Sequence, residues 1–259
     1  MPTGAIVAGG RSTRFGDADK SVAELRGVPM IRRVANRLAG VDDPVPPGAD
    51  RAAGGDPVVD DLVVNCRPDQ RDAIAAAMEG LPLPIRWALD DDVDQGPMAG
   101  IRTACRATPG EYVLVVACDM PFVDPGFVAS LFDDARGEGV DGSDDVSGRG
   151  VDGNDASRSY DDASRSYDAA SRSYDAAVPQ LSDRWLQTTQ AVYHADAMAT
   201  ACDRALARGD RKVLDAVEAL DSVVVDDGAI RSRTTERTFT NVNTREELDE
   251  AETFLDDYV

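Results

Sequence analysis

Residues 7–20 have the sequence Val-Ala-Gly-Gly-Arg-Ser-Thr-Arg-Phe-Gly-Asp-Ala-Asp-Lys. The small apolar residues that lead into this stretch predict a short, buried parallel strand. Gly9 and Gly10 then allow the backbone to turn tightly and to bring its N–H groups against an anion. Arg14 and Lys20 add cationic donors to the turn. The stretch therefore predicts a strand that ends in a phosphate-binding loop, as in α/β folds.

Two common phosphate-binding patterns are absent from this loop. Gly16 is followed by Asp17, so G-x-x-x-x-G-K-[ST] does not occur, and neither does G-x-G-x-x-G. The glycine pair alone also fits an ordinary strand-to-helix turn with a solvated basic rim. The added spacing of Arg14, Gly16 and Lys20 favours a nucleotide-binding loop over that plain turn.

Short apolar runs alternate with segments of helical spacing along the chain. Alternation of this kind predicts βαβ units, a mostly parallel sheet, and a ligand crevice at the carboxyl ends of the strands. Thr244 and Glu247 have the spacing of a capping box at the start of the last helix. The expected strands are 5–8, 62–65, 85–89, 112–118, 187–193 and 222–225, and the expected helices are 30–38, 70–78, 98–106, 125–135, 197–208 and 244–254.

A chain of 259 residues with 42% apolar content can bury one substantial core, so residues 1–259 are expected to form one domain. Two polar segments interrupt the pattern, at residues 41–60 and 137–177, and both are expected to be surface insertions. The second contains Ala-Ser-Arg-Ser-Tyr-Asp three times at a seven-residue spacing. A solvated loop is favoured for it over a partner-binding tail or an amphipathic helix.

Acidic residues outnumber basic ones by 48 to 27, and the formal net charge is −21. Lys20 and Lys212 are the only lysines. Such a surface is typical of proteins from saline cytoplasm, where salt screens self-repulsion, and unfolding at low salt is expected. The charge argues against nucleic acid or an anionic membrane as a partner. Four cysteines without C-x-x-C spacing predict reduced, buried thiols, and a cytoplasmic protein is expected because no signal peptide or membrane-length apolar run occurs.

Three further features lie near expected strand or helix ends. Asp119 ends the strand at 112–118, where a carboxylate suits Mg²⁺, although a plain turn or cap is the alternative. Pro97, between Gly96 and Gly100, is placed to start a helix whose N-terminus a ligand can approach. The polar pair Asn241 and Asn243 precedes the last helix. Asn243 can contact a phosphate or complete a metal shell, and Asn241 can also cap the turn.

The chain resembles the molybdenum cofactor guanylyltransferases in five segments that occur in the same order. They are the glycine loop at 7–16 with Asp19-Lys20, Val64-Asn65, Gly-Pro-Met-Ala-Gly at 96–100, Cys-Asp-Met-Pro at 118–121 and Asn-Val-Asn-Thr-Arg-Glu-Glu-Leu at 241–248. The likeness covers nearly the whole chain except the two insertions. It implies a Rossmann-like, three-layer α/β nucleotidyltransferase fold of the glycosyltransferase-A-like kind. It also implies transfer of GMP from GTP to molybdenum-molybdopterin, which releases pyrophosphate and forms the molybdopterin guanine dinucleotide cofactor.

The resemblance assigns roles to matching positions. Arg14, Lys20 and Asp119 are the expected catalytic residues, with Asp119 holding Mg²⁺. An aspartate shortly before Gly96 also contacts nucleotide in the family; Asp90, Asp91 and Asp92 compete for that role, and Asp90 is favoured. The expected nucleotide-binding residues are Val7, Ala8, Gly9, Gly10, Lys20, Asn65, Asp90 and Asp119, with Asn65 on the base or ribose. Those expected for the second substrate are Gln190, Arg211, Lys212, Asn241 and Asn243.

Two departures and several alternatives accompany the resemblance. Phe15 stands where the family more often has Met, and the two acidic insertions have no family counterpart. The nearest alternatives keep the fold and change a substrate: cytidylyl transfer to molybdopterin, or guanylyl transfer to a cobamide or phospholactate precursor. A noncatalytic nucleotide-binding scaffold in cofactor delivery is the alternative of another class. Transient contacts with molybdenum-insertion proteins or acceptor molybdoenzymes are also expected.

Overall fold

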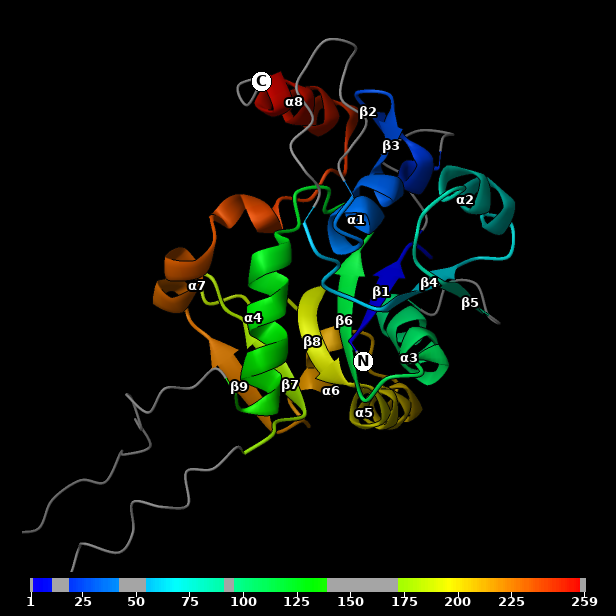
Figure 1. Ribbon diagram of the computed structural model, residues 1–259. Coiled ribbons are helices and arrows are strands. Elements are labelled where there is room, and N and C mark those ends of the chain that lie inside the picture. Colours follow the sequence, from blue (N-terminus) through cyan, green and yellow to red (C-terminus); the bar gives the residue numbers. More distant parts are fainter. Residues whose placement is uncertain (1, 11–18, 42–54, 91–95, 139–171, 257–259) are drawn as a thin grey trace, which may run out of the picture.

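A seven-stranded sheet forms the centre of the computed structural model, which describes residues 2–10, 19–41, 55–90, 96–138 and 172–256 (Figure 1). The strand order is β5-β4-β1-β6-β8-β7-β9, and β8 is the one of these seven that runs antiparallel to its neighbours. The mostly parallel α/β fold expected from the sequence is confirmed. The strands are β1 (Thr3–Val7), β4 (Asp61–Cys66), β5 (Ile85–Leu89), β6 (Tyr112–Ala117), β7 (Ala176–Pro179), β8 (Gln190–His194) and β9 (Ser222–Val225), with a separate pair, β2 (Glu24–Leu25) and β3 (Val28–Pro29).

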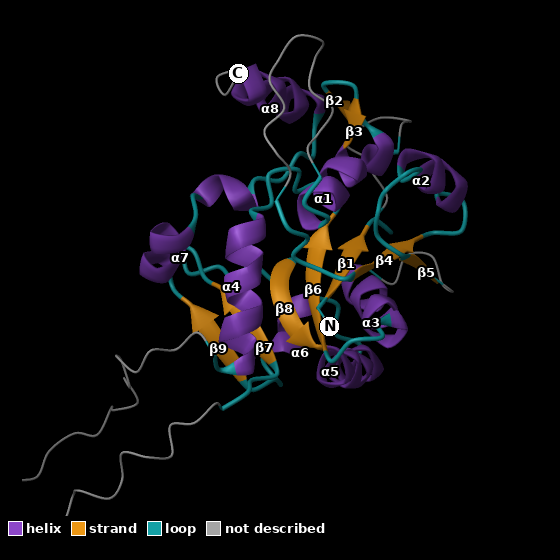
Figure 2. Cartoon of the chain, in the orientation of Figure 1, coloured by secondary structure: helices purple, strands orange, loops and turns teal. Residues whose placement is uncertain are grey.

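Helices cover both faces of the sheet and give three layers (Figure 2). One face packs against α1 (Met30–Leu38), α2 (Arg71–Ala77), α4 (Pro125–Arg136) and α7 (Asp227–Arg233). The other packs against α3 (Pro97–Ala107), α5 (Ala195–Arg208) and α6 (Val213–Val217). The remaining helical segments are η1 (Lys20–Val22), η2 (Glu236–Phe239) and α8 (Arg245–Asp256).

The strand β6 shows why the chain needs two helical layers. Leu114 and Val116 face the core formed with α1 and α4, whereas Val113 and Val115 face the core formed with α3 and α5. Successive side chains of a strand point to opposite faces, so a strand buried on both sides needs a continuous apolar run. This run made β6 recognisable in the sequence.

The strand register brings three strand ends together. Val7 of β1 lies opposite Asn65 of β4 on one side and Ala117 of β6 on the other. Because all three strands are parallel, the segments that follow them emerge at one edge of the sheet. Cys118 N donates to Val7 O at 3.1 Å, which fixes the start of the Asp119 segment beside the glycine loop.

The capping box predicted for the last helix is confirmed. Glu247 N donates to Thr244 Oγ1 at 3.1 Å, and Thr244 N donates to a carboxylate oxygen of Glu247 at 3.0 Å. These contacts satisfy backbone donors that the first turn of a helix leaves without partners. The helix α8 therefore starts at Arg245, next to the polar segment that carries Asn241 and Asn243.

One end of each expected surface insertion belongs to the core. Val59 is 1% exposed and packs in the core with α1, although it falls within the expected insertion at 41–60. Ala176 and Ala177, at the end of the second, are buried residues of β7. Residues 42–54 and 139–171, with most of the heptad repeat, lie outside the described residues.

All four cysteines are buried free thiols, as the sequence predicted. Burial raises the pKa of the Cys66 thiol to about 11 and that of Cys202 to about 12. Burial also raises the pKa values of Cys105 and Cys118. Since thiolate is the reactive form, these side chains stay unreactive near neutral pH while the fold persists. Of the helices that the structure describes, none has both the length and the apolar character needed to cross a membrane.

Candidate active site

A cavity of about 470 Å³ opens at the carboxyl ends of β1, β4 and β6. Its position is the one that the βαβ pattern predicted for a ligand crevice. Every nucleotide-binding residue expected from the sequence contributes to its wall. The lining consists of Val7, Ala8, Gly9, Gly10, Lys20, Ser21, Asn65, Asp90, Gly96, Pro97, Ala99, Gly100, Ala117, Cys118, Asp119 and Thr189.

Lys20 and Asp119 line the cavity and meet Asn243, although the three residues are far apart in sequence. The Lys20 ammonium donates to Asp119 Oδ2 at 2.5 Å and to Asn243 Oδ1 at 3.0 Å. Val242 N donates to the backbone oxygen of Asp119 at 2.9 Å and so holds the asparagine segment in place. Asp119 Oδ1 is buried and has no hydrogen-bond partner among the described residues. Asp119 Oδ1 is therefore the carboxylate oxygen that a ligand in the cavity can contact.

Asp90 is held in the cavity by Asn65. The Asn65 amide donates to Ala88 O at 2.9 Å and to Asp90 Oδ1 at 2.8 Å, and Asn65 is only 1% exposed. Both N–H groups of this amide are therefore engaged within the protein. In this geometry Asn65 orients Asp90, whose carboxylate lines the cavity.

Two glycines allow this packing. A Cβ atom on Gly9 would overlap Asp90 Oδ2, and one on Gly100 would lie 2.5 Å from Asn65 Oδ1. Any side chain at either position would therefore displace the Asn65–Asp90 pair. Pro97 begins α3, and Gly96 before it has φ +79°. Because Gly96, Pro97, Ala99 and Gly100 line the cavity, the N-terminus of α3 faces it. The Gly-Pro-Met-Ala-Gly segment thus supplies both close approach and a helix N-terminus.

Gly9→Ala is expected to raise KM for the nucleotide about tenfold or more, because overpacking of this kind costs about 1–3 kcal/mol and would move Asp90. Steady-state kinetics with varied nucleotide measures the effect. Gly55→Ala is the matched control, since Gly55 is exposed and a Cβ there would meet no atom within 4 Å. Unchanged kinetics in Gly9→Ala would mean that Asp90 does not touch the nucleotide.

The residues expected for the second substrate lie in different settings. Arg211 and Lys212 are exposed, and the backbone oxygen of Arg211 lies 4.0 Å from a Cβ built on Gly96, at the rim of the cavity. Asn243 contacts Lys20, and Asn241 is exposed on the same segment. Gln190, in contrast, is fully buried and donates to Thr238 Oγ1 at 2.7 Å, and its contact with the second substrate stays a prediction. Its neighbour Thr189 lines the cavity.

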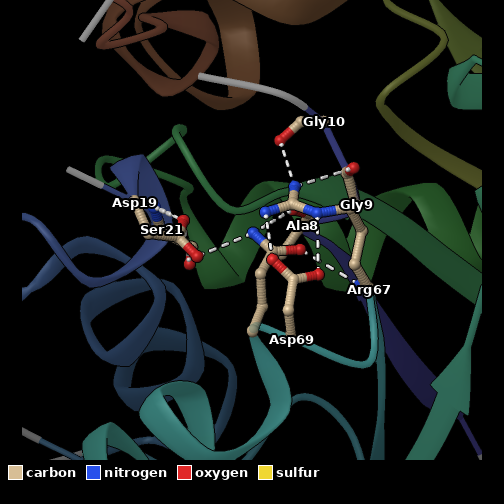
Figure 3. Close-up of polar contacts among 8 residues, drawn as sticks. Ala8, Gly9, Gly10, Asp19, Ser21, Arg67 and Asp69 are labelled. Atoms are coloured by element: carbon tan, nitrogen blue, oxygen red, sulfur yellow. Dashed lines mark hydrogen bonds and ion pairs between the residues drawn. The ribbon is translucent and has the colours of Figure 1, made fainter. Parts of the chain in front are cut away.

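Some site residues fall outside either the prediction or the structure. Arg14, Asp91 and Asp92 lie outside the described residues. Ser21 and Thr189 line the cavity but carry no recognisable sequence signal. Arg67 and Gln70 were also missed. Arg67 donates to the backbone oxygens of Gly9 and Gly10 (Figure 3). Gln70 donates to the backbone oxygen of Ala8. The sequence feature nearest to Arg67 and Gln70 was Asn65, which lies shortly before both of them.

Comparisons with known proteins show which proteins this chain is similar to. The sequence pattern of the MobA-like NTP transferase domain matches residues 4–148. A probable molybdenum cofactor guanylyltransferase of Natronomonas pharaonis is 37% identical over 96% of this chain and 96% of its own length. One from Haloferax mediterranei is 33% identical over 95% of this chain and 90% of its own length.

Solved structures support the fold. Molybdopterin-guanine dinucleotide biosynthesis protein A of Archaeoglobus fulgidus superposes with a TM-score of 0.63 at 23% identity, over 98% of this chain and 99% of its own. The 4-diphosphocytidyl-2C-methyl-D-erythritol synthase of Anaerococcus prevotii gives a TM-score of 0.60 at 12% identity, over 98% of both chains. These likenesses show a shared fold.

Proposed function

This chain belongs to the MobA-like NTP transferase family, and from that premise we propose that it transfers GMP from GTP to molybdenum-molybdopterin. The reaction releases pyrophosphate and forms the molybdopterin guanine dinucleotide cofactor. The observation that carries the proposal is the cavity in which the glycine loop, Lys20, Asp90 and Asp119 lie together. The substrates are GTP and molybdenum-molybdopterin.

The proposed reaction is an in-line displacement at phosphorus. An oxygen of the terminal phosphate of molybdopterin attacks the α-phosphorus of GTP, a new P–O bond forms, and the bond to the bridging oxygen of pyrophosphate breaks. The nucleophile is already an anion, so no side chain has to remove a proton from it. The Lys20 ammonium and the backbone N–H groups of the loop then stabilise charge on the phosphate oxygens. Arg14 is proposed to act with them.

The residues present fit a magnesium ion bound together with the nucleotide. Asp119 Oδ1 is buried and without a hydrogen-bond partner in the described parts of the chain, and one carboxylate with waters and phosphates is a set that Mg²⁺ accepts. When bound, Mg²⁺ would neutralise charge on the phosphates. Asp119 would hold it, and Lys20 and Asn243 would keep Asp119 in place through their contacts.

Asp90 is proposed to recognise the base. Guanine presents two adjacent N–H donors on one edge, and a carboxylate accepts from both. Asn65 fixes the orientation of Asp90 by donating to its Oδ1. Arg211, Lys212, Asn241 and Asn243 are proposed to meet the second substrate, and transient contacts with molybdenum-insertion proteins or acceptor molybdoenzymes in the cytoplasm complete the proposal.

The test is incubation of the folded protein in concentrated KCl with Mg²⁺, molybdenum-molybdopterin and either GTP or CTP, followed by release and identification of the attached nucleotide. GMP attachment is the expected result. CMP attachment would reassign the base within the same fold. Failure with both nucleotides would overturn the proposal and turn the search to a cobamide or phospholactate acceptor or to a noncatalytic role.

A further inference from the structure

Gln70 is a buried side chain, 2% exposed, whose polar atoms are all engaged. Its Oε1 accepts from Arg67 N at 3.0 Å. Its Nε2 donates to Ala8 O at 3.1 Å and to Asp19 Oδ2 at 2.8 Å. A primary amide has two N–H groups, so this arrangement uses both.

The two acceptors of Nε2 lie on either side of the glycine loop. Ala8 directly follows β1, and Asp19 directly precedes Lys20. The other oxygen of Asp19 accepts from Ser21 N at 3.0 Å and from Ser21 Oγ at 2.8 Å, which caps η1 (Figure 3). Gln70 therefore joins the segment before the loop to the short helix that carries Lys20.

Arg67 acts on the same segment from the same side. Its Nη1 donates to Gly10 O at 2.9 Å and to Gly9 O at 3.3 Å (Figure 3). In a planar trans peptide the C=O and N–H point in opposite directions, so holding the Gly9 oxygen turns the Gly10 N–H away from Arg67. Arg67 also contacts Asp69 at 3.1 Å, which offsets its charge. Its part is thus to orient the backbone.

We infer that Gln70 is a positioning residue for nucleotide binding: it sets the distance between the start of the glycine loop and Lys20. The inference rests on the proposed function, since it assumes that Lys20 and the loop meet the phosphates of GTP. Gln70 does not line the cavity and acts through Ala8 and Asp19. Without this link, Lys20 would keep its contact with Asp119 and lose its fixed relation to the loop.

Gln70→Glu tests this with a change of one atom. The carboxylate still accepts from Arg67 N, but its second oxygen faces the Ala8 oxygen and the Asp19 carboxylate, so both donated bonds become repulsive contacts. Affinity for GTP in the presence of MgCl₂ is expected to fall about tenfold or more, which corresponds to the loss of one or two hydrogen bonds. Titration calorimetry with GTP alone measures this.

Asp19→Asn tests the same contact at its other partner, which is less buried than Gln70. Whichever way the new amide turns, either the contact with Gln70 or the contact with Ser21 is lost, so GTP affinity is again expected to fall. The double variant Gln70→Glu with Asp19→Asn restores a donor–acceptor pair between the two side chains. Its affinity is expected to exceed that of Gln70→Glu by about threefold or more, since about one hydrogen bond is regained.

Gln180→Glu is the matched control, because Gln180, which like Gln70 does not line the cavity, also donates to a backbone oxygen, but to that of Arg184 and not to that of Ala8. It is expected to bind GTP as the wild type does. Circular dichroism checks that each variant is folded, and Asp19→Asn decides the matter if Gln70→Glu does not fold. Wild-type affinity in folded Gln70→Glu or Asp19→Asn overturns the inference, as does a double variant no better than Gln70→Glu. Failure of the proposed function would appear separately, as wild-type protein that attaches no GMP to molybdopterin.

Discussion

Asp119→Asn is expected to lower kcat for guanylyl transfer about 10³-fold, since it removes the carboxylate proposed to hold the Mg²⁺ that neutralises charge on the phosphates. The side chain loses its charge and keeps its size, so its contact with Lys20 weakens from a charge-assisted bond to a neutral acceptor. The backbone contact between Val242 N and the Asp119 oxygen does not depend on the side chain and should remain. Single-turnover measurements with saturating GTP report the chemical step.

Asp72→Asn provides a control at an aspartate whose side chain is 95% exposed and contacts the exposed Arg71. It should leave kcat unchanged. Lys20→Ala should show a loss comparable to that of Asp119→Asn, and both variants should retain the wild-type circular dichroism spectrum. Folded Asp119→Asn with more than about one tenth of wild-type turnover would remove this residue from the proposed chemistry, because that is far less than the expected loss.

Removal of salt is expected to unfold the protein. The net charge is −21, and the distance over which charges repel grows from about 3 Å at 1 M salt to about 30 Å at 0.01 M. Ion pairs such as Arg106–Asp203 and Arg208–Asp210 are substantially exposed and offset little of this repulsion. The cooperative unfolding transition should be lost on dilution from concentrated KCl to about 0.01 M.

The buried thiols give a direct reading of that transition. Cys66, Cys105, Cys118 and Cys202 should resist a thiol reagent at pH 8 in concentrated KCl and should all react at low salt. A parallel dilution into sucrose, which favours burial without screening charge, separates the two effects of salt. Resistance of all four thiols at 0.01 M salt would contradict the prediction. The relatives from Natronomonas pharaonis and Haloferax mediterranei come from halophilic archaea.

The sequence predicted the elements with strong periodicity. The expected ranges of α1, β5 and β9 agree with the observed ones, and β1, β4 and β6 differ by two residues or fewer at each end. The strands β1, β4 and β6 form recognisable patterns because their side chains are almost all buried, on both faces of the sheet. The glycine loop and the strand ends then placed the cavity at the correct edge of the sheet.

Short elements that depend on tertiary packing were missed or misplaced. The strand β7 is only Ala176–Pro179, follows a long polar segment, and is held by pairing with β8 and β9. The helices α6 (Val213–Val217) and α7 (Asp227–Arg233) are too short to show a helical period. Expected strand 187–193 begins only at Gln190, since the three residues before it form a turn that returns from β7.

At the site, the sequence identified residues but not the contacts that each of them makes. Asn65 was expected to contact base or ribose, yet its amide is occupied by Ala88 and Asp90. The contact of Gln70 with Ala8 spans 62 positions and that of Lys20 with Asn243 spans 223, and no local pattern encodes either. Such assignments depend on three-dimensional packing, and they remain predictions until the variants above are measured.

The contact between Lys20 and Asn243, with Val242 bonded to Asp119, has a consequence for protein synthesis. The strands β1, β4 and β6 emerge early from the ribosome, but this wall of the cavity needs a segment that is translated after η2. A nascent chain that carries the glycine loop, Lys20 and Asp119 therefore still lacks the residue that steadies them. Nascent chains should consequently acquire full competence for GTP only after the segment that carries Val242 and Asn243 has left the ribosome.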